Sequence, residues 1–208
     1  MAQPNITLLE NDLDEKCLTH YLSKDVIAVD CEMMGLNITR DRLCLIQIGD
    51  ENQKITLVKI EQGQESAPNL KKLMEASNVL KLFHFARTDL AFLSYYLNIS
   101  VANVFCTKVA SKLVRTYTDK HSLRELTKEI IGKDLRKDQQ TSDWGSEKLT
   151  PEQIKYAAND VVHLIEIFNN LKFMLKRENK FELATKCSSF IPTMAHLDII
   201  GYKELFEH

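Results

Sequence analysis

Four acidic residues and one tyrosine occur in three short segments whose residue types and spacing could do chemistry. Asp30 and Glu32 are two residues apart at the end of a predicted strand, so both side chains point to the same face. Asp89 is predicted to lie in the first turn of a helix that follows a later strand. Tyr156 and Asp160 are four residues apart and share one face of a predicted long helix. Each pattern alone also fits a plain structural role, as a solvated loop, a helix N-terminus or an ordinary helix face.

Taken together, the four carboxylates favour a site for divalent cations. Hard oxygen ligands without cysteine or histidine select Mg²⁺ or Mn²⁺. Two such ions, about 3.5–4 Å apart, can activate a water molecule and stabilise the leaving oxygen of a phosphodiester. The phenol beside the last carboxylate can hydrogen-bond the attacking water. The pattern therefore predicts phosphodiester hydrolysis with two metal ions.

The elements that must position these residues alternate between strands and helices. Short apolar runs predict strands over 26–31, 43–49, 54–58, 79–83 and 101–105. Helical patterns cover 70–76, 87–97, 107–115, 122–131, 151–176 and 179–187. Thr150, Pro151 and Gln153 have the types expected at the start of a helix. We expect an α/β fold class, with a mixed sheet flanked by helices and no linker between two domains.

Length and composition limit the function classes. A chain of 208 residues suggests one domain, at roughly 150 residues per domain. Its 27 Lys+Arg and 29 Asp+Glu give a net charge of −2. A protein that coats long nucleic acid by charge alone is usually basic, so that class is disfavoured. A short nucleic acid, held partly through metal ions, remains compatible with this charge.

The cysteines and the N-terminal segment bear on localisation. The five cysteines form no CxxC pair, which fits buried thiols in a reducing compartment. The first residues carry acidic groups and lack the basic and apolar regions of a signal peptide. No apolar run approaches the length of a membrane span. We therefore expect a cytoplasmic protein that has no membrane partner.

The three segments resemble the motifs of the ribonuclease D type of DEDD exonucleases, tyrosine subgroup. The first motif is matched by DCEMMGL at 30–36, the second by FARTDL at 85–90 and the third by YAAND at 156–160. The stretch 135–144 resembles that family's K-x-Q-Q-x-S-D-W loop. The similarity runs from about residue 10 to 176. It implies a ribonuclease H-like fold and metal-dependent 3′-5′ removal of nucleotides from RNA.

The resemblance also implies a role for each matched residue. The metal carboxylates correspond to Asp30, Glu32, Asp89 and Asp160, and the residue that orients the water corresponds to Tyr156. The loop that holds and wedges the terminal base corresponds to Met33, Met34, Gly35 and Leu36. Further substrate contacts are implied for His84, Lys137, Gln140 and Trp144.

Three features depart from the ribonuclease D pattern. Met33 and Met34 stand where relatives have smaller or hydroxyl-bearing residues, which bears on how the terminal base is held. Cys106-Thr107 stands where the family usually has Asp-Thr, so any role of that acid is lost or taken over elsewhere. We also expect the helical domain that follows the nuclease in full-length ribonuclease D to be missing, because this chain of 208 residues leaves room for the nuclease and two short helices. Its last residues resemble a compact subgroup, nanoRNase C, whose members are ring-forming homo-oligomers, octamers in that subgroup, that cut very short oligoribonucleotides, notably dinucleotides. We expect an exonuclease domain over 1–176 and a helical tail over 177–208, packed on the domain or on a neighbouring subunit.

Other functions remain open at this point. The same carboxylates would serve a general ribonuclease D-like enzyme that trims tRNA or other RNA, or an exonuclease acting on single-stranded DNA. A catalytically silent nucleic-acid-binding module is the non-enzymatic alternative. Lys108, Lys112 and Arg115 share one predicted helical face, which could line a groove for a strand or simply be solvated.

Overall fold

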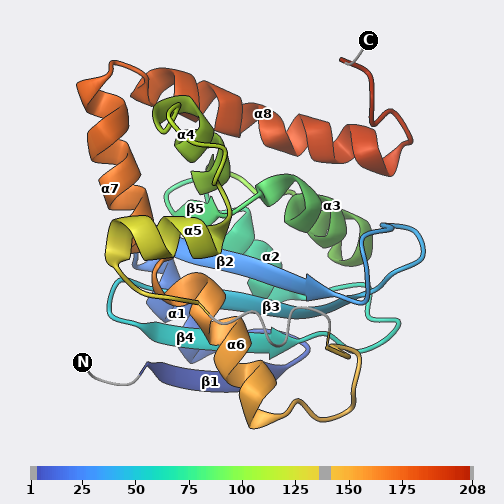
Figure 1. Ribbon diagram of the computed structural model, residues 1–208. Coiled ribbons are helices and arrows are strands. Elements are labelled where there is room, and N and C mark those ends of the chain that lie inside the picture. The colour runs from blue at the N-terminus through green and yellow to red at the C-terminus, as the bar shows by residue number, and fades with distance from the viewer. Residues whose placement is uncertain (1–3, 136–141, 207–208) are drawn as a thin grey trace.

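The computed structural model describes residues 4–135 and 142–206, which form a mixed sheet covered by helices on both faces (Figure 1). The strands are β1 (Asn5–Glu10), β2 (Val26–Met33), β3 (Leu43–Gly49), β4 (Lys54–Lys59), β5 (Leu80–Phe83) and β6 (Val104–Cys106). The helices are α1 (Glu15–Leu22), α2 (Pro68–Met74), α3 (Ala86–Leu97), α4 (Thr107–Val114), α5 (Leu123–Leu126), α6 (Pro151–Val162), α7 (Leu164–Arg177) and α8 (Phe181–Ile199), with a π-helical turn at Thr127–Ile131. The predicted α/β fold class is confirmed.

The strand order β1-β4-β3-β2-β5-β6 places β2 and β3 at the centre of the sheet. The neighbours β2, β3 and β4 are antiparallel, whereas β1, β5 and β6 pair in parallel with their neighbours. Alternate residues of β2 enter two different cores. Ile27 and Val29 pack with α1, α2 and α3, and Ala28 packs with α4, α6 and α7. Asp30 and Glu32 follow Ala28 with a period of two, so they point to the face that α6 covers.

The last helix packs on the same chain. Ile191 and Ala195 of α8 join the core that contains α3. Beyond this core, the Arg87 guanidinium donates through Nε and Nη2 to the two carboxylate oxygens of Asp198, at 2.6 and 2.7 Å. Nη2 also donates to the carbonyl of Lys203. These hydrogen bonds connect helix α3, which carries the second motif, to the end of α8.

Several elements differ from the sequence-based prediction. Strand β1 was not predicted, and the strand expected over 101–105 is β6, at Val104–Cys106. The helix predicted over 151–176 is two helices that change direction at His163, and the helix predicted over 179–187 extends to Ile199. Among the described residues, no helix combines the length and apolar character needed to cross a membrane.

Candidate active site

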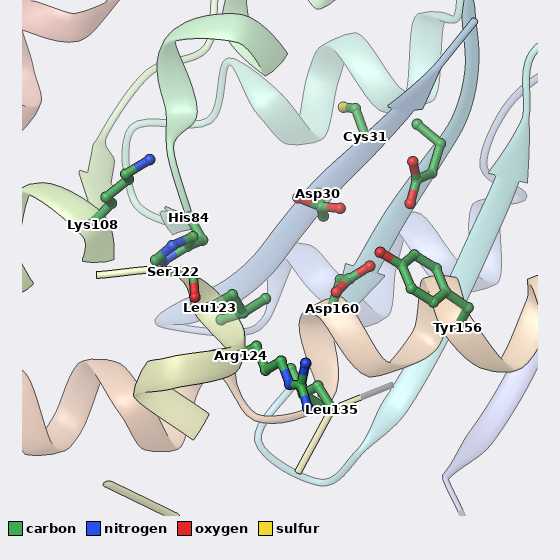
Figure 2. Close-up of a pocket in the computed structure, with 11 residues that line it drawn as sticks. Asp30, Cys31, His84, Lys108, Ser122, Leu123, Arg124, Leu135, Tyr156 and Asp160 are labelled. Carbon is green, nitrogen blue, oxygen red and sulfur yellow. The ribbon is translucent and has the colours of Figure 1, made fainter. Parts of the chain in front are cut away.

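Strand β2 and helix α6 bring three of the predicted carboxylates together. One carboxylate oxygen from each of Asp30, Glu32 and Asp160 lies within 4.8 Å of the others. Asp30 and Asp160 face each other in Figure 2, with the Tyr156 hydroxyl directed toward them. Such a set of oxygen atoms has the donor chemistry of a site for a hard divalent cation. The three carboxylates therefore form a candidate metal site.

Asp89 lies beside this cluster, on helix α3. It is buried in the first turn of α3 and lines a cavity together with Asp30 and Glu32. Its charge contributes to the raised pKa values of both residues. All four carboxylates that the sequence singled out are thus neighbours, although they come from three separate segments.

Helix α6 is held in place by local signals in the sequence. Thr150 Oγ1 accepts a hydrogen bond from the Gln153 backbone N–H, and Gln153 Oε1 accepts one from the Thr150 N–H. This capping box satisfies two backbone donors at the start of the helix. Ala157 and Ala158 are fully buried, so the helix lies close against the sheet. At the opposite end, a Cβ atom added to Gly49 of β3 would lie 3.3 Å from Val161 Cγ2.

Burial makes the four carboxylates hold protons strongly. Burial raises the pKa of Glu32 to about 9, with further contributions from the charges of Asp160 and Asp89. Burial also raises the pKa of Asp160 to about 7. The pKa of Asp30 is well above its usual range because the group is buried and faces the other three acids, and burial does the same for Asp89. A bound cation would stabilise the ionised form of these carboxylates. The four residues therefore have the chemistry of a cation site.

Tyr156 and His84 have neutral side chains at physiological pH. Burial, followed by the charges of Asp160, Glu32 and Asp30, raises the pKa of the Tyr156 phenol. Burial lowers the pKa of His84 to about 3, and the charge of Lys108 adds to this effect. His84 Nδ1 lies 3.0 Å from Thr107 Oγ1, which donates to the Phe83 carbonyl. Thr107 therefore helps to fix the histidine ring.

Two cavities adjoin the carboxylate cluster. The smaller, about 310 Å³, lies between Tyr156 and Asp160 on one side and Lys108 on the other (Figure 2). The larger, about 760 Å³, extends from the cluster toward α3. Both include Asp30, Glu32 and His84 in their walls. The cluster therefore lies at the junction of two cavities, where a reacting bond could sit with room on either side.

The residues predicted to contact substrate fall into three groups. Met33, Met34, Gly35 and Leu36 line the larger cavity, and His84 lines both. Trp144 is instead buried beside Tyr156, with the ring centroids 6.0 Å apart, and the described walls of both cavities do not include it. Lys137 and Gln140 lie outside the described residues.

The basic face predicted on helix α4 is only partly accessible. Lys108 lines the smaller cavity, whereas Lys112 is exposed on the next turn and is absent from the described cavity walls. Arg115 is fully buried and donates to the Lys120 carbonyl and to Ser111 Oγ. The interpretation of all three residues as one groove or one solvated face is therefore wrong. A burial of this kind cannot be seen in the helical spacing alone.

The structure also adds residues that sequence reasoning missed. Phe85, Thr88 and Ser142 line the larger cavity, and Arg124 lines the smaller one. Phe85 lies within the second motif, between His84 and the helix that carries Asp89. A large apolar residue at that position, directly before a predicted functional helix, was the available signal. Cys106, which replaces the family's usual aspartate, is buried, and its backbone N–H donates to Ser188 Oγ.

Comparison with known proteins places this geometry among nucleases. The model of a 3′-5′ exonuclease family matches residues 6–176. NrnC of Brucella melitensis has a similar structure, with a TM-score of 0.93 and 42% identity over 98% of this chain and 99% of that chain. Similar structures of NrnC contain bound Mg²⁺, at 39% identity and a TM-score of 0.92 over 98% of this chain and 99% of that chain, or pGG, at 40% identity and a TM-score of 0.93 over 99% and 100%.

Curated relatives match part of the chain. DNA polymerase I of Aquifex aeolicus is 36% identical over 77% of this chain. Ribonuclease D of Gluconacetobacter diazotrophicus is 30% identical over 75% of it. The match covers 26% of the polymerase and 39% of the ribonuclease, so this chain spans less than half of either relative.

Proposed function

The chain belongs to the 3′-5′ exonuclease family, and from this premise we propose that it is a metal-dependent exoribonuclease that removes nucleoside 5′-monophosphates from short oligoribonucleotides. The observation that carries the proposal is the cluster of Asp30, Glu32 and Asp160, whose oxygens lie within 4.8 Å of one another. Asp89 is buried beside this cluster and Tyr156 points toward it. These five residues are the proposed catalytic and metal-binding set.

The proposed cofactor is a pair of divalent cations, Mg²⁺ or Mn²⁺, held by the four carboxylates. Four carboxylates match the charge of two such ions, and their oxygens suit hard cations. When bound, the cations would supply the positive charge that favours ionisation of a water molecule and stabilises the leaving oxygen. The NrnC structure with bound Mg²⁺ supports this assignment.

The remaining residues would position the reactants. Because Tyr156 keeps its proton, its hydroxyl can hydrogen-bond the attacking water and orient it toward phosphorus. The segment from Met33 to Leu36 would hold the terminal base on the wall of the larger cavity. His84, held by Thr107, would contact the terminal nucleotide as a neutral ring.

A short substrate is favoured by the size of the site and by the net charge. The two cavities, of about 310 and 760 Å³, have the dimensions of small-ligand sites. A net charge of −2 offers little general attraction to a long polyanion. NrnC bound to pGG supports the same substrate class.

We also propose that the enzyme is a homo-oligomer with a tail over 177–208 that follows an exonuclease domain over 1–176. The tail exposes several large apolar side chains, which are Leu183, Phe190, Ile200, Tyr202, Leu205 and Phe206. Apolar groups of this size gathered in one segment are typical of a protein interface. An octameric ring is the form expected from the resemblance to nanoRNase C.

The proposal is tested by a time course on 5′-labelled RNAs of two, seven and about thirty nucleotides, with Mg²⁺ or Mn²⁺. Rapid cleavage of the dinucleotide and slow trimming of the long RNA are the expected results. A regular ladder from the long RNA, with the dinucleotide intact, would indicate general ribonuclease D-like trimming. Faster cleavage of matched DNA would assign a DNA exonuclease instead. Binding without hydrolysis of any oligonucleotide would indicate a silent module.

A further inference from the structure

Phe85 is an exposed aromatic side chain on the wall of the larger cavity. It is 51% exposed, and two other apolar residues of the same wall, Met34 at 51% and Leu36 at 79%, are similarly open. Exposed apolar side chains that line a cavity next to polar groups are typical of a ligand site. The flat face of a nucleobase is one ligand that matches such a surface.

The backbone conformation of Phe85 indicates a functional role for this residue rather than a role in folding. Its φ of 73° and ψ of 45° lie in the left-handed region, which bulky residues rarely adopt. Phe85 occupies the N-cap position of α3, yet its side chain cannot accept the hydrogen bonds that a polar cap would. The hydrophobic core formed by the described residues does not include it. Strain without a folding benefit is commonly kept at functional sites.

Lys108 supports the ring and faces the reaction site. Its Nζ lies 3.9 Å from the centroid of the Phe85 ring, within the range of a cation–π interaction. Lys108 also lines the smaller cavity, opposite Tyr156 and Asp160 (Figure 2). Among the described residues, it forms no ion pair. Its positive charge is therefore available to an anionic ligand.

We infer that Phe85 and Lys108 form a nucleotide subsite in which the ring stacks on one base of the substrate and the ammonium group contacts a phosphate of the same strand. This inference deepens the proposed function and depends on it. The aromatic ring contributes a contact that any base can use, and the lysine contributes charge without base selectivity. The subsite would thus add affinity for short oligonucleotides without reading their sequence.

The stacking contact is tested by steady-state kinetics of Phe85→Ala and Phe85→Trp on a dinucleotide. Loss of one base–aromatic stack should raise KM roughly tenfold, with kcat changed less than about twofold. Phe85→Trp should keep KM near the wild-type value because it retains an aromatic face. Phe173→Ala is the matched control, since Phe173 is 70% exposed on α7 and absent from the described cavity walls. Phe85→Gly, which suits the left-handed backbone, repeats the test if Phe85→Ala folds poorly.

Substrates that lack one base show which contact is lost. For a dinucleotide with an abasic ribose at the stacked position, wild-type enzyme and Phe85→Ala should have the same KM. At the other position, the roughly tenfold difference between the two proteins should persist. A difference that persists at both positions would overturn the stacking assignment.

The phosphate contact is tested by the dependence of KM on salt. Lys108→Met keeps the length of the side chain but removes its charge, so the slope of log KM against log salt should fall by about 0.7, the value for one phosphate contact to a single strand. Lys108→Arg should retain the slope. Lys112→Met, one turn further along α4, should also leave it unchanged.

The outcomes separate the two proposals. Wild-type protein that cleaves no oligonucleotide would contradict the proposed function. Active wild-type enzyme, with KM unaltered in Phe85→Ala and the salt slope unaltered in Lys108→Met, would contradict the subsite alone.

Discussion

Asp30, Glu32 and Asp160 place three acidic groups close together in a partly buried region. Charges at this spacing repel one another strongly in a medium of low dielectric constant. Protons or cations must therefore occupy the cluster. This repulsion lowers the stability of the folded protein at the site that we propose for catalysis.

Asp30→Asn should separate activity from stability at the residue scale. The amide keeps the shape of the side chain but removes an acidic group and with it one anionic metal ligand. We expect kcat to fall by more than about 10²-fold. The metal-free protein should become more stable above about pH 4, because asparagine, unlike Asp30, does not have to take up a proton on folding. Activity assays together with thermal unfolding in EDTA check both effects, and a fully active Asp30→Asn enzyme would contradict the metal site.

Tyr156→Phe should affect the chemical step and leave substrate binding nearly unchanged. The Tyr156 hydroxyl is proposed to hydrogen-bond the attacking water. Phenylalanine has no hydroxyl group and cannot orient that water. A positioned general acid–base or water-orienting group contributes about 10²–10⁴-fold, so we expect kcat to fall within that range. KM should stay within about twofold. A large rise in KM at constant kcat would instead assign Tyr156 to substrate binding.

Most of the candidate site could be predicted from the sequence because its residues follow local rules. Asp30 and Glu32 share a face by strand period, and Tyr156 and Asp160 do so by helical period. Trp144 and Arg115 show where such reasoning stops, since each is buried by elements distant in sequence. Phe85 was missed because its left-handed backbone conformation cannot be foreseen from a phenylalanine. Glycine or asparagine at that position would have indicated it.

At the scale of elements, helix α6 carries two of the five proposed catalytic residues, so its cap bears on the geometry of the site. Thr150→Ala removes the hydroxyl that accepts the Gln153 N–H bond. We expect the free energy of unfolding to fall by about 1 kcal/mol. Urea denaturation measures this loss. Thr150→Ser keeps the cap and is the control; an equal loss in that variant would show that the hydroxyl does not stabilise the helix.

The two ends of α6 also show which element boundaries a sequence can reveal. Its start was predicted because Thr150, Pro151 and Gln153 are local signals for a helix N-terminus. Its end was not predicted because residue 163 is a histidine, with no glycine or proline nearby to indicate the break. Strand β1 was missed for a different reason. It is a half-exposed edge strand whose stability depends on pairing with β4, more than forty residues away.

For the whole molecule, the carboxylate cluster links stability to pH and to metal ions. The raised pKa values, about 7 for Asp160 and about 9 for Glu32, mean that the folded chain holds protons that the unfolded chain has already released above about pH 4. The metal-free protein should therefore lose stability as pH rises from about 4 to 9. Cations that replace these protons should reverse that loss.

Thermal unfolding with and without Mg²⁺ measures this link. At a Mg²⁺ concentration tenfold above Kd, we expect about 1.4 kcal/mol of stabilisation, or an increase in Tm of about 3–6 °C. At one fixed Mg²⁺ concentration, the increase should be larger at pH 8 than at pH 6, because fewer protons compete for the carboxylates and Kd is lower. Asp30→Asn should show a smaller increase at both pH values. Equal stabilisation of both proteins would indicate that Mg²⁺ binds elsewhere.

The ion pair between Arg87 and Asp198 joins residues that are 111 positions apart in the chain. During translation, the strands and the third-motif helix leave the ribosome well before Asp198 does. Helix α3 can therefore form this ion pair with α8 only after the segment around Asp198 has been synthesised. We expect a ribosome-bound chain stalled before Asp198 to lack this ion pair, so that α3, which carries Asp89, is joined to α8 only after the third-motif helix has left the ribosome.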